Sequence, residues 1–356
     1  MISLQQLLKT VVKQNATDLH IVAGSPPALR IDGRIVRVKS QELTPEDTQK
    51  LCYSVITDEQ RAHFENYHEL DFSFGIKGTA RFRANLFFQQ RGSVSGVFRR
   101  IPIEVPTIES LGLPQAVQDL VSLPHGLVLV TGPTGSGKTT TIASIIDKIN
   151  RDRRSHIMTL EDPIEYVHKH KTAIVNQREV HFDTNSYKEG LKYLLRQDPD
   201  VCMIGELRDV DTVETALNVA ETGHLVFGTL HTQSAIQTIT RMVSLFPSGQ
   251  QDRIRNQISM TLQGVVSQRL LPAVGGGLSA IIEVLVLNSS VRNLIRENKL
   301  HQIYGMMQVG QNKSGMITLN QALLNAVMKR KIDIKHAFEA SPDVEELDKM
   351  MKKVGI

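Results

Sequence analysis

The stretch GPTGSGKT, residues 132–139, constrains the fold of this chain more than any other feature. It follows an apolar run, Leu127–Thr131, and precedes isoleucines at 142, 145, 146 and 149, which is helical spacing. The order strand, GxxxxGK[ST], helix is the context of a phosphate-binding loop, and it disfavours a chance glycine-rich turn. The glycines let backbone amides converge on phosphate oxygens, and the helix amino terminus adds partial positive charge.

This loop predicts a nucleotide site that binds ATP with Mg²⁺. Lys138 is expected to neutralise the β- and γ-phosphates, and the Thr139 hydroxyl is expected to bind the metal ion. The residues predicted to bind the nucleotide are Gly132, Pro133, Thr134, Gly135, Ser136, Gly137, Lys138, Thr139 and Thr140.

Length and composition set the outer limits. A chain of 356 residues exceeds the usual size of a single core, so two domains are expected. The net charge of +4 comes without a Lys/Arg block, which gives little support for a nucleic-acid partner. Cys52 and Cys202 lie far apart and in no CxxC spacing, which argues against a disulfide framework or structural zinc and fits a reducing cytoplasm.

The first hundred residues predict an α+β module. Leu4, Leu7, Leu8, Val11 and Val12 recur at helical spacing, which indicates an amphipathic helix rather than a signal peptide. ALRIDGRIVRV, with an Asp32-Gly33 turn, and DFSFGIKGTARFRANLFF, with a turn at residues 75–78, are typical of β-hairpins. In the second hairpin one face is predicted to be apolar and the other polar. The apolar face holds Phe82, Ala84, Leu86 and Phe88, and the polar face Arg81, Arg83 and Asn85.

The pattern changes after a linker predicted at residues 101–114, which contains Pro102, Pro106 and Pro114. From Gln115 on, apolar runs alternate with helical stretches, which predicts a parallel α/β sheet buried on both faces. The last 65 or so residues are predicted to be helical. The example DVEELDKMMKKVGI should place Val344, Leu347, Met351 and Val354 on one side of a helix.

Two further apolar strands end in acids. LEDPIE carries Glu161 and Asp162, either of which could orient or deprotonate a water molecule, although Asp162 before Pro163 is equally typical of a helix cap. DVCMIGELRD ends in Glu206, a position where phosphate-loop ATPases usually carry a metal-supporting Asp. Because Glu is one methylene longer, we expect it to reach Mg²⁺ through water. Arg208 and Asp209 could form a surface ion pair.

The stretch TGHLVFGTLHT carries two histidines seven positions apart, which raises the question of a metal pair. The residues between them favour a strand. In a strand the odd offset places His224 and His231 on opposite faces and roughly 23 Å apart, so they cannot share a metal ion. His231 is predicted at the carboxyl edge with the phosphates, as a candidate γ-phosphate sensor beside Glu206, and His224 at the opposite end.

Taken together, these motifs resemble the secretion ATPases of the type II and type IV pilus class, most closely the PilT-type pilus-retraction ATPases. The resemblance covers nearly the whole chain: DLHIVAGSPPALRIDGRI, ARFRANLFFQQRG, GPTGSGKTT, TLEDPIEY, GELRD and TGHLVFGTLHT. It implies a PAS-like domain at 1–100, a linker at 101–114, a RecA-like phosphate-loop core at 115–288 and a helical region at 289–356. The implied fold class is α/β with an N-terminal α+β domain.

The resemblance also implies an ATP-hydrolysing homohexamer that retracts type IV pili, with nucleotide bound between domains and completed by a neighbouring subunit. It would act at the cytoplasmic face of the inner membrane on a platform protein and, indirectly, on pilin. Glu161 would be the catalytic base, and Glu206 would support Mg²⁺ and water. Arg81 and Arg83, with Arg99 as an addition, would contact phosphates across the subunit interface, although arginines on a polar strand face are usually just solvated.

SVRNLIRE, residues 290–297, is similar to the retraction subgroup's signature, which normally begins Ala-Ile where this chain has Ser290 and Val291. The resemblance assigns Arg292 and Arg296 to the coupling of hydrolysis to retraction, and His224 is a further candidate for this coupling. The simpler interpretation is a surface helix in which the charged residues are solvent-exposed and the buried residues are Val291, Leu294 and Ile295.

Three other functions compete with retraction. A pilus-assembly or secretion ATPase of the same superfamily usually has a longer N-terminal region and a four-cysteine zinc motif. A RecA-like nucleic-acid motor would need a basic channel or aromatic stacking residues, and the chain has no Trp. A non-hydrolysing paralogue is disfavoured because Lys138, Thr139, Glu161 and Glu206 are all present.

Overall fold

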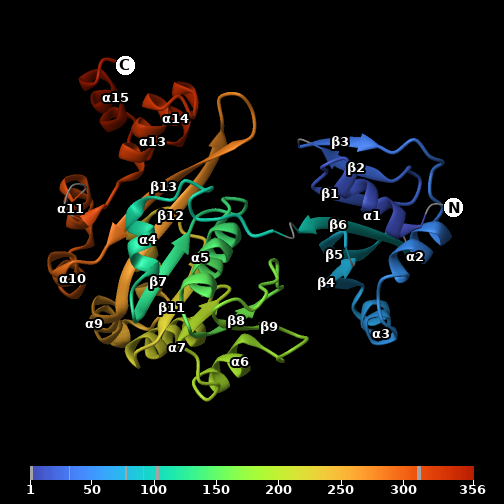
Figure 1. Cartoon of the computed structure of the whole chain (residues 1–356), viewed down its shortest axis with the longest axis horizontal. Helices are drawn as coiled ribbons and strands as arrows, with labels where there is room; N and C mark the ends of the chain where they lie inside the picture. The colour runs from blue at the N-terminus through green and yellow to red at the C-terminus, as the bar shows by residue number, and fades with distance from the viewer. Residues whose placement is uncertain (1–2, 32, 77, 91, 102–103, 311–313) are drawn as a thin grey trace. The chain divides into compact units, whose positions relative to one another are not determined.

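The computed structural model describes the chain except residues 1–2, 32, 77, 91, 102–103 and 311–313. Asp32 of the predicted turn and Pro102 of the predicted linker therefore lie outside the described residues. The chain divides into two compact units (Figure 1). The first comprises Met1–Glu104 and Pro163–Val167, and the second comprises Val105–Asp162 and His168–Ile356.

The first unit is a six-stranded antiparallel sheet with helices, in the strand order β3-β2-β1-β6-β5-β4. Its elements are α1 (Leu4–Lys13), β1 (Asp18–Ile21), β2 (Ala28–Ile31), β3 (Arg34–Arg37), α2 (Pro45–Tyr53), α3 (Asp58–Tyr67), β4 (Glu69–Ile76), β5 (Ala80–Gln89) and β6 (Ser93–Ile101). The predicted amphipathic helix and both hairpins are present.

Alternation along β5 decides which face of this sheet is covered. Phe82, Ala84 and Leu86 are fully buried, whereas Arg81 and Arg83 between them are only half-buried. Helix α1 adds Leu4, Leu7, Leu8 and Val11 to the same core. The polar face of β5 therefore carries the two arginines, as the sequence pattern predicted.

The second unit contains a seven-stranded sheet in the order β13-β12-β7-β11-β10-β8-β9. Every pair is parallel except β12 with β13. The strands are β7 (Gly126–Thr131), β8 (His156–Glu161), β9 (Ile174–Glu179), β10 (Val201–Ile204), β11 (Leu225–Leu230), β12 (Leu262–Pro272) and β13 (Leu278–Val286). The helices are α4 (Gln115–Val121), α5 (Lys138–Asp152), α6 (Tyr187–Leu194), α7 (Val210–Glu221), α8 (Ala235–Ser244), η1 (Ser248–Gln250) and α9 (Gln251–Thr261).

Both faces of this sheet are buried, as predicted. Leu127 and Leu129 of β7 belong to one hydrophobic cluster, and Val128 and Val130 belong to another. Helices cover the two faces, which Figure 1 shows for α5 and α7. The polar strand β9 and the β12–β13 hairpin are additions that the apolar-run pattern did not predict.

The C-terminal segment is helical, as expected. It comprises α10 (Ser289–Arg296), η2 (Leu300–Gln302), α11 (Ile303–Val309), α13 (Leu319–Met328), α14 (Ile334–Ala340) and α15 (Val344–Lys353). The predicted apolar side of α15 is only partly correct. Leu347 and Met351 are buried, but Val344 and Val354 are 52% and 46% exposed because they lie at the two ends of the helix.

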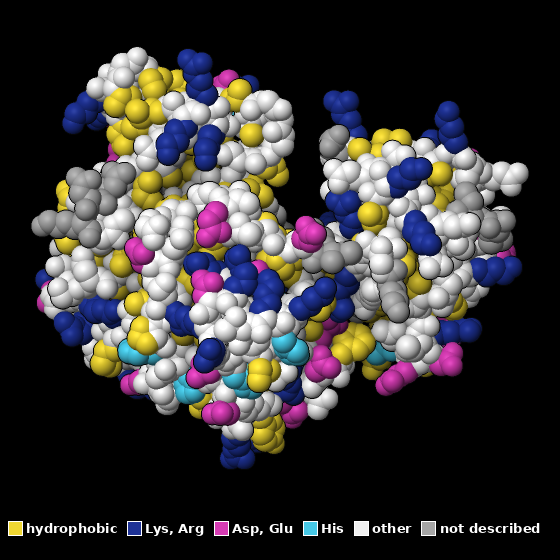
Figure 2. Space-filling model, in the orientation of Figure 1, with side chains coloured by type: hydrophobic (Ala, Val, Ile, Leu, Met, Phe, Trp, Pro, Cys, Tyr) yellow, Lys and Arg dark blue, Asp and Glu magenta, His cyan; other side chains and the backbone are white. Residues whose placement is uncertain are grey.

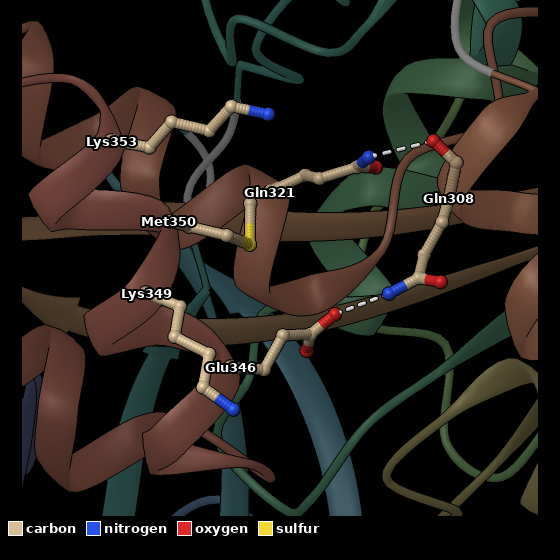
Figure 3. Close-up of a pocket in the computed structure, with 6 residues that line it drawn as sticks. All are labelled: Gln308, Gln321, Glu346, Lys349, Met350 and Lys353. Atoms are coloured by element: carbon tan, nitrogen blue, oxygen red, sulfur yellow. Dashed lines mark hydrogen bonds between the residues drawn. The ribbon is translucent and has the colours of Figure 1, made fainter.

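Polar contacts join these C-terminal helices around a pocket of about 300 Å³ (Figure 3). The Gln308 side chain of α11 donates to Glu346 of α15, and the Gln321 side chain of α13 donates to the Gln308 carbonyl at 3.0 Å. The pocket is thus a junction of three helices.

Among the described residues, no helix is long and apolar enough to cross a membrane. Cys52 and Cys202 are both buried and unpaired, and burial raises the pKa of each thiol to about 12. On the face drawn in Figure 2, basic and acidic side chains of the second unit are interspersed.

Candidate active site

The carboxyl ends of four neighbouring strands, β7, β11, β10 and β8, meet at one edge of the seven-stranded sheet. Their register aligns Thr131 with Leu230, Gly228 with Ile204, and Ile204 with Leu160. Because the strands are parallel, the segments that follow them lie side by side. This edge therefore brings together the phosphate loop, His231, Glu206 and Glu161.

The phosphate loop has the backbone conformation that its glycines allow. Gly132 has φ 146° and Gly137, the N-cap of α5, has φ 85°, both in the region that side chains disfavour. A Cβ at Gly132 would also lie 2.6 Å from the Ser136 hydroxyl oxygen. Gln268 of β12 donates to the Ser136 carbonyl and so braces the loop from the neighbouring strand.

Lys138, His231 and Glu206 form a chain of polar contacts. The Lys138 amino group donates to the carbonyl oxygens of Gly132 (2.8 Å) and Pro133 (3.0 Å), and lies 3.4 Å from His231 Nδ1. His231 Nε2 lies 3.3 Å from Glu206 Oε1. An ammonium group offers only donors, so this arrangement assigns the proton of a neutral His231 to Nε2, facing the carboxylate.

Glu161, the last residue of β8, is 5% exposed and is held in a fixed orientation. Its Oε1 accepts hydrogen bonds from the Thr159 hydroxyl (2.6 Å) and from the Gln177 side chain of β9 (3.0 Å). Thr159 and Gln177 are directly paired in the sheet register. Neither was predicted, although alternation along β8 places Thr159 on the same face as Glu161.

Two interpretations of the neighbouring acids were wrong. Residues 162–170 contain no helix, so Asp162 caps none and Pro163 begins none. Arg208 pairs with Glu206 at 2.7 Å rather than with Asp209. Asp209 instead is the N-cap of α7, where it accepts from the Thr212 amide at 2.9 Å. The guanidinium group of Arg208 thus belongs to the polar network of this edge.

The two histidines lie at opposite ends of β11, as strand geometry predicted. His224 Nδ1 lies 3.1 Å from the carbonyl oxygen of Val219 and 3.1 Å from the Thr222 hydroxyl. No group of three or more His, Cys, Asp or Glu side chains that could hold a metal ion occurs in the part of the chain that the structure describes. Because β11 separates the two rings, they do not form a metal pair.

A threonine of α8 links the segment after His231 to the phosphate loop. The hydroxyls of Thr238 and Thr232 lie 2.6 Å apart, and the Thr238 hydroxyl lies 3.5 Å from that of Thr131, the last residue of β7. Thr238 itself is fully buried. This contact connects the segment after His231 to the end of β7.

The arginines of the first unit have local partners in the structure. Arg81 donates to Ser73, Arg83 lies 4.0 Å from Asp71, and Arg99 donates to the buried Asp18 at 2.9 Å. A contact of these arginines with nucleotide stays a prediction.

In the signature segment of α10, Val291 and Ile295 are fully buried and Leu294 is partly buried, as predicted. The interpretation of Arg292 as a solvent-exposed side chain was wrong. Its guanidinium donates to the carbonyl oxygens of Ser259 (2.6 Å) and Met260 (3.1 Å) and to the Gln263 side chain (2.8 Å). It thereby ties α10 to the end of α9 and the start of β12, and burial lowers its pKa. Arg296 is exposed and contacts Asn293.

Comparison with known proteins places this chain among secretion ATPases. The family model for type II/IV secretion system proteins matches residues 1–277. The type IV pilus retraction ATPase PilT of Pseudomonas aeruginosa is 47% identical over 334 residues, which cover 94% of this chain and 96% of that protein. A twitching motility protein of Neisseria gonorrhoeae is 45% identical, over 91% of this chain and 87% of its own length. A solved structure of the pilus retraction motor PilT with bound ADP has a TM-score of 0.92 and 52% identity, and the match covers 98% of this chain and all of that one.

Proposed function

This chain belongs to the type II/IV secretion system protein family and is an ATPase, and we propose that its ATP hydrolysis powers the retraction of type IV pili. The observation that carries this proposal is the convergence of the phosphate loop, Glu161, Glu206 and His231 on four neighbouring strand ends. The similarity to retraction ATPases over more than nine-tenths of the chain supports retraction over the assembly or nucleic-acid functions.

In the proposed mechanism the amides of the phosphate loop and the amino end of α5 bind the ATP phosphates. Lys138 turns from the loop carbonyls towards the β- and γ-phosphates, where its charge stabilises the transition state. Glu161 accepts a proton from the attacking water, and its hydrogen bonds with Thr159 and Gln177 hold the carboxylate in place.

The residues at this edge fit an Mg²⁺ ion bound together with ATP. Mg²⁺ prefers oxygen ligands and retains several waters, and it neutralises charge on the phosphates when bound. Thr139 offers a hydroxyl in the first turn of α5. Both Glu206 oxygens already contact other side chains, Arg208 and His231, which favours a role through water rather than direct coordination. His231 joins Lys138 to Glu206, and we assign it the sensing of the γ-phosphate.

We further propose that the working unit is a homohexameric ring at the cytoplasmic face of the inner membrane, acting on a platform protein and through it on pilin. Arg81 and Arg83, with Arg99, would complete the site of a neighbouring subunit. His224, Arg292 and Arg296 would couple hydrolysis to movement. The contacts of Arg292 with the end of α9 support this role, because they tie the signature helix to the sheet.

The test is genetic. Loss of the gene should give cells with persistent, excess pili and no surface motility, and wild-type chain supplied in trans should restore retraction. The Glu161→Gln chain should restore neither pilus retraction nor surface motility. Cells that lose pili altogether would indicate an assembly ATPase instead. Stimulation of ATP turnover by single-stranded DNA rather than by platform components would contradict the pilus function.

A further inference from the structure

Helix α6 packs closely on the strand that ends in Glu161. A Cβ at Gly190 of α6 would lie 2.9 Å from the side-chain methyl groups of Leu160, so glycine permits this approach. Leu191 and Leu194 bury the same side of the helix in the core. Tyr187 lies one turn before Gly190, on the same side of the helix.

The Tyr187 hydroxyl lies against the strand end that leads to Glu206. A Cβ at Gly205 would be 2.7 Å from this hydroxyl oxygen and 3.4 Å from the Glu161 Cα. Gly205 itself joins the two neighbouring strands, because its amide donates to the Leu160 carbonyl at 2.8 Å and its carbonyl accepts from the Thr229 hydroxyl. The phenol therefore lies where the segments that carry Glu161 and Glu206 meet.

The surroundings keep this hydroxyl protonated. Burial is the main reason that the pKa of Tyr187 is raised, and the negative charges of Asp162, Glu161 and Glu206 act in the same direction, whereas Arg208 opposes them. Among the described residues, no hydrogen bond to this hydroxyl contributes to the raised pKa. A partly buried donor near the carboxylates of Asp162, Glu161 and Glu206 suits a ligand or a water molecule that arrives with the substrate.

We propose that the Tyr187 hydroxyl positions the water that attacks the γ-phosphate, a role that rests on the ATPase function of this site. The water donates one proton to Glu161, accepts a hydrogen bond from Tyr187 with one lone pair, and attacks phosphorus with the other. The new O–P bond forms as the P–O bond to ADP breaks, and the proton removed stays on Glu161 until product release. Tyr187 keeps its own proton throughout.

The test compares two tyrosines of the same helix in the full-length chain. Tyr187→Phe removes the hydroxyl and keeps the ring, and Tyr193→Phe does the same at a position that is 46% exposed. We expect kcat to fall about tenfold in Tyr187→Phe, with KM for ATP and the melting temperature little changed, because one neutral hydrogen bond is lost. Tyr193→Phe should match the wild type. Affinity for ADP with aluminium fluoride, which imitates the transition state, should fall about tenfold in Tyr187→Phe, while affinity for ADP alone should not.

Equal kcat values for Tyr187→Phe and the wild type would overturn the proposal. If kcat and the melting temperature fell together in Tyr187→Phe, the affinities for ADP with aluminium fluoride and for ADP alone would decide. A ratio of these two affinities equal to that of the wild type would mean a structural role for Tyr187 and would also overturn the proposal. A wild-type chain without ATP turnover would instead refute the ATPase function, and the tyrosine's role with it.

Discussion

The two edges of the seven-stranded sheet differ in what their polar side chains contact. At the carboxyl edge, His231 contacts both Lys138 and Glu206, and Arg208 pairs with Glu206. At the amino edge, His224 contacts the Val219 carbonyl and the Thr222 hydroxyl, both at 3.1 Å. His156 contacts the Asp198 carbonyl at 2.8 Å and the Asn176 side chain at 2.9 Å. Charged side chains thus contact one another at the carboxyl edge, whereas the two amino-edge histidines contact backbone carbonyls and neutral side chains. We therefore expect chemistry at one edge and support and coupling at the other.

The largest effect should come from the carboxyl edge. Glu161→Gln keeps the size of the side chain but cannot accept the proton of water, so ATP turnover should fall by about 10²–10⁴-fold. Nucleotide binding and assembly should persist, which a fluorescent ATP analogue and size-exclusion chromatography would measure. Glu214→Gln, which removes a carboxylate of α7 that pairs with Arg253, is the matched control. Wild-type turnover in Glu161→Gln would refute the assignment of the base.

The two histidines that flank β11 test the comparison at the two ends of one strand. His231→Ala breaks the link between Lys138 and Glu206, so turnover should fall about 10²-fold. His224→Ala should hydrolyse ATP at nearly the wild-type rate but fail to restore pilus retraction in cells. ATP turnover and surface motility of both variants give the answer. A His224→Ala chain with no turnover would remove the distinction between the edges.

Arg292 should affect stability more than chemistry. Arg292→Met leaves the carbonyl groups of Ser259 and Met260 without their guanidinium donor, so the free energy of unfolding should fall by about 1–3 kcal/mol. Arg296→Met, which removes one exposed contact on the same helix, should cost less than about 0.5 kcal/mol. Urea unfolding measures both values. Equal losses in the two variants would contradict the anchoring role of Arg292.

The smallest effect concerns pH. Burial lowers the pKa of His168 below its ordinary 6.5; the nearby Asp147 opposes this shift and Lys171 adds to it. Because the folded state favours the neutral ring, the contribution of the His168 ring to the stability of the folded state is fully present above pH 6.5. This contribution is lost as the pH falls through the lower pKa of the folded state. The melting temperature should therefore fall between pH 7 and pH 5, and by less in His168→Phe. Parallel curves for the two proteins would exclude His168 as the cause.

Much of the carboxyl edge could be predicted from the sequence, because the signal is local. Each strand is a short apolar run, and its functional residue follows at once, as in Leu127–Thr131 before the phosphate loop. Parallel topology then brings Glu161, Glu206 and His231 together without any long-range information. The opposite placement of His224 and His231 followed from the strand period alone.

The supporting residues could not be predicted in this way, because they come from distant segments. Gln268 braces the phosphate loop from β12, a strand that the apolar pattern did not identify, and Gln177 reaches Glu161 from the polar strand β9. Asp162 was misjudged because Pro163 suits a helix start that tertiary structure does not use. Helical periodicity placed Arg292 on the solvent-exposed side of its helix. It cannot indicate that the end of another helix accepts hydrogen bonds from the Arg292 guanidinium.

The most direct test of whether ATP binds at the carboxyl edge of the seven-stranded sheet is a crystal structure of the full-length chain with Mg²⁺ and a non-hydrolysable ATP analogue. We predict the γ-phosphate within hydrogen-bonding distance of Lys138, with Glu161 and Glu206 as the nearest carboxylates and His224 remote from the nucleotide. Phosphates bound at the amino edge, or away from residues 132–139, would contradict it.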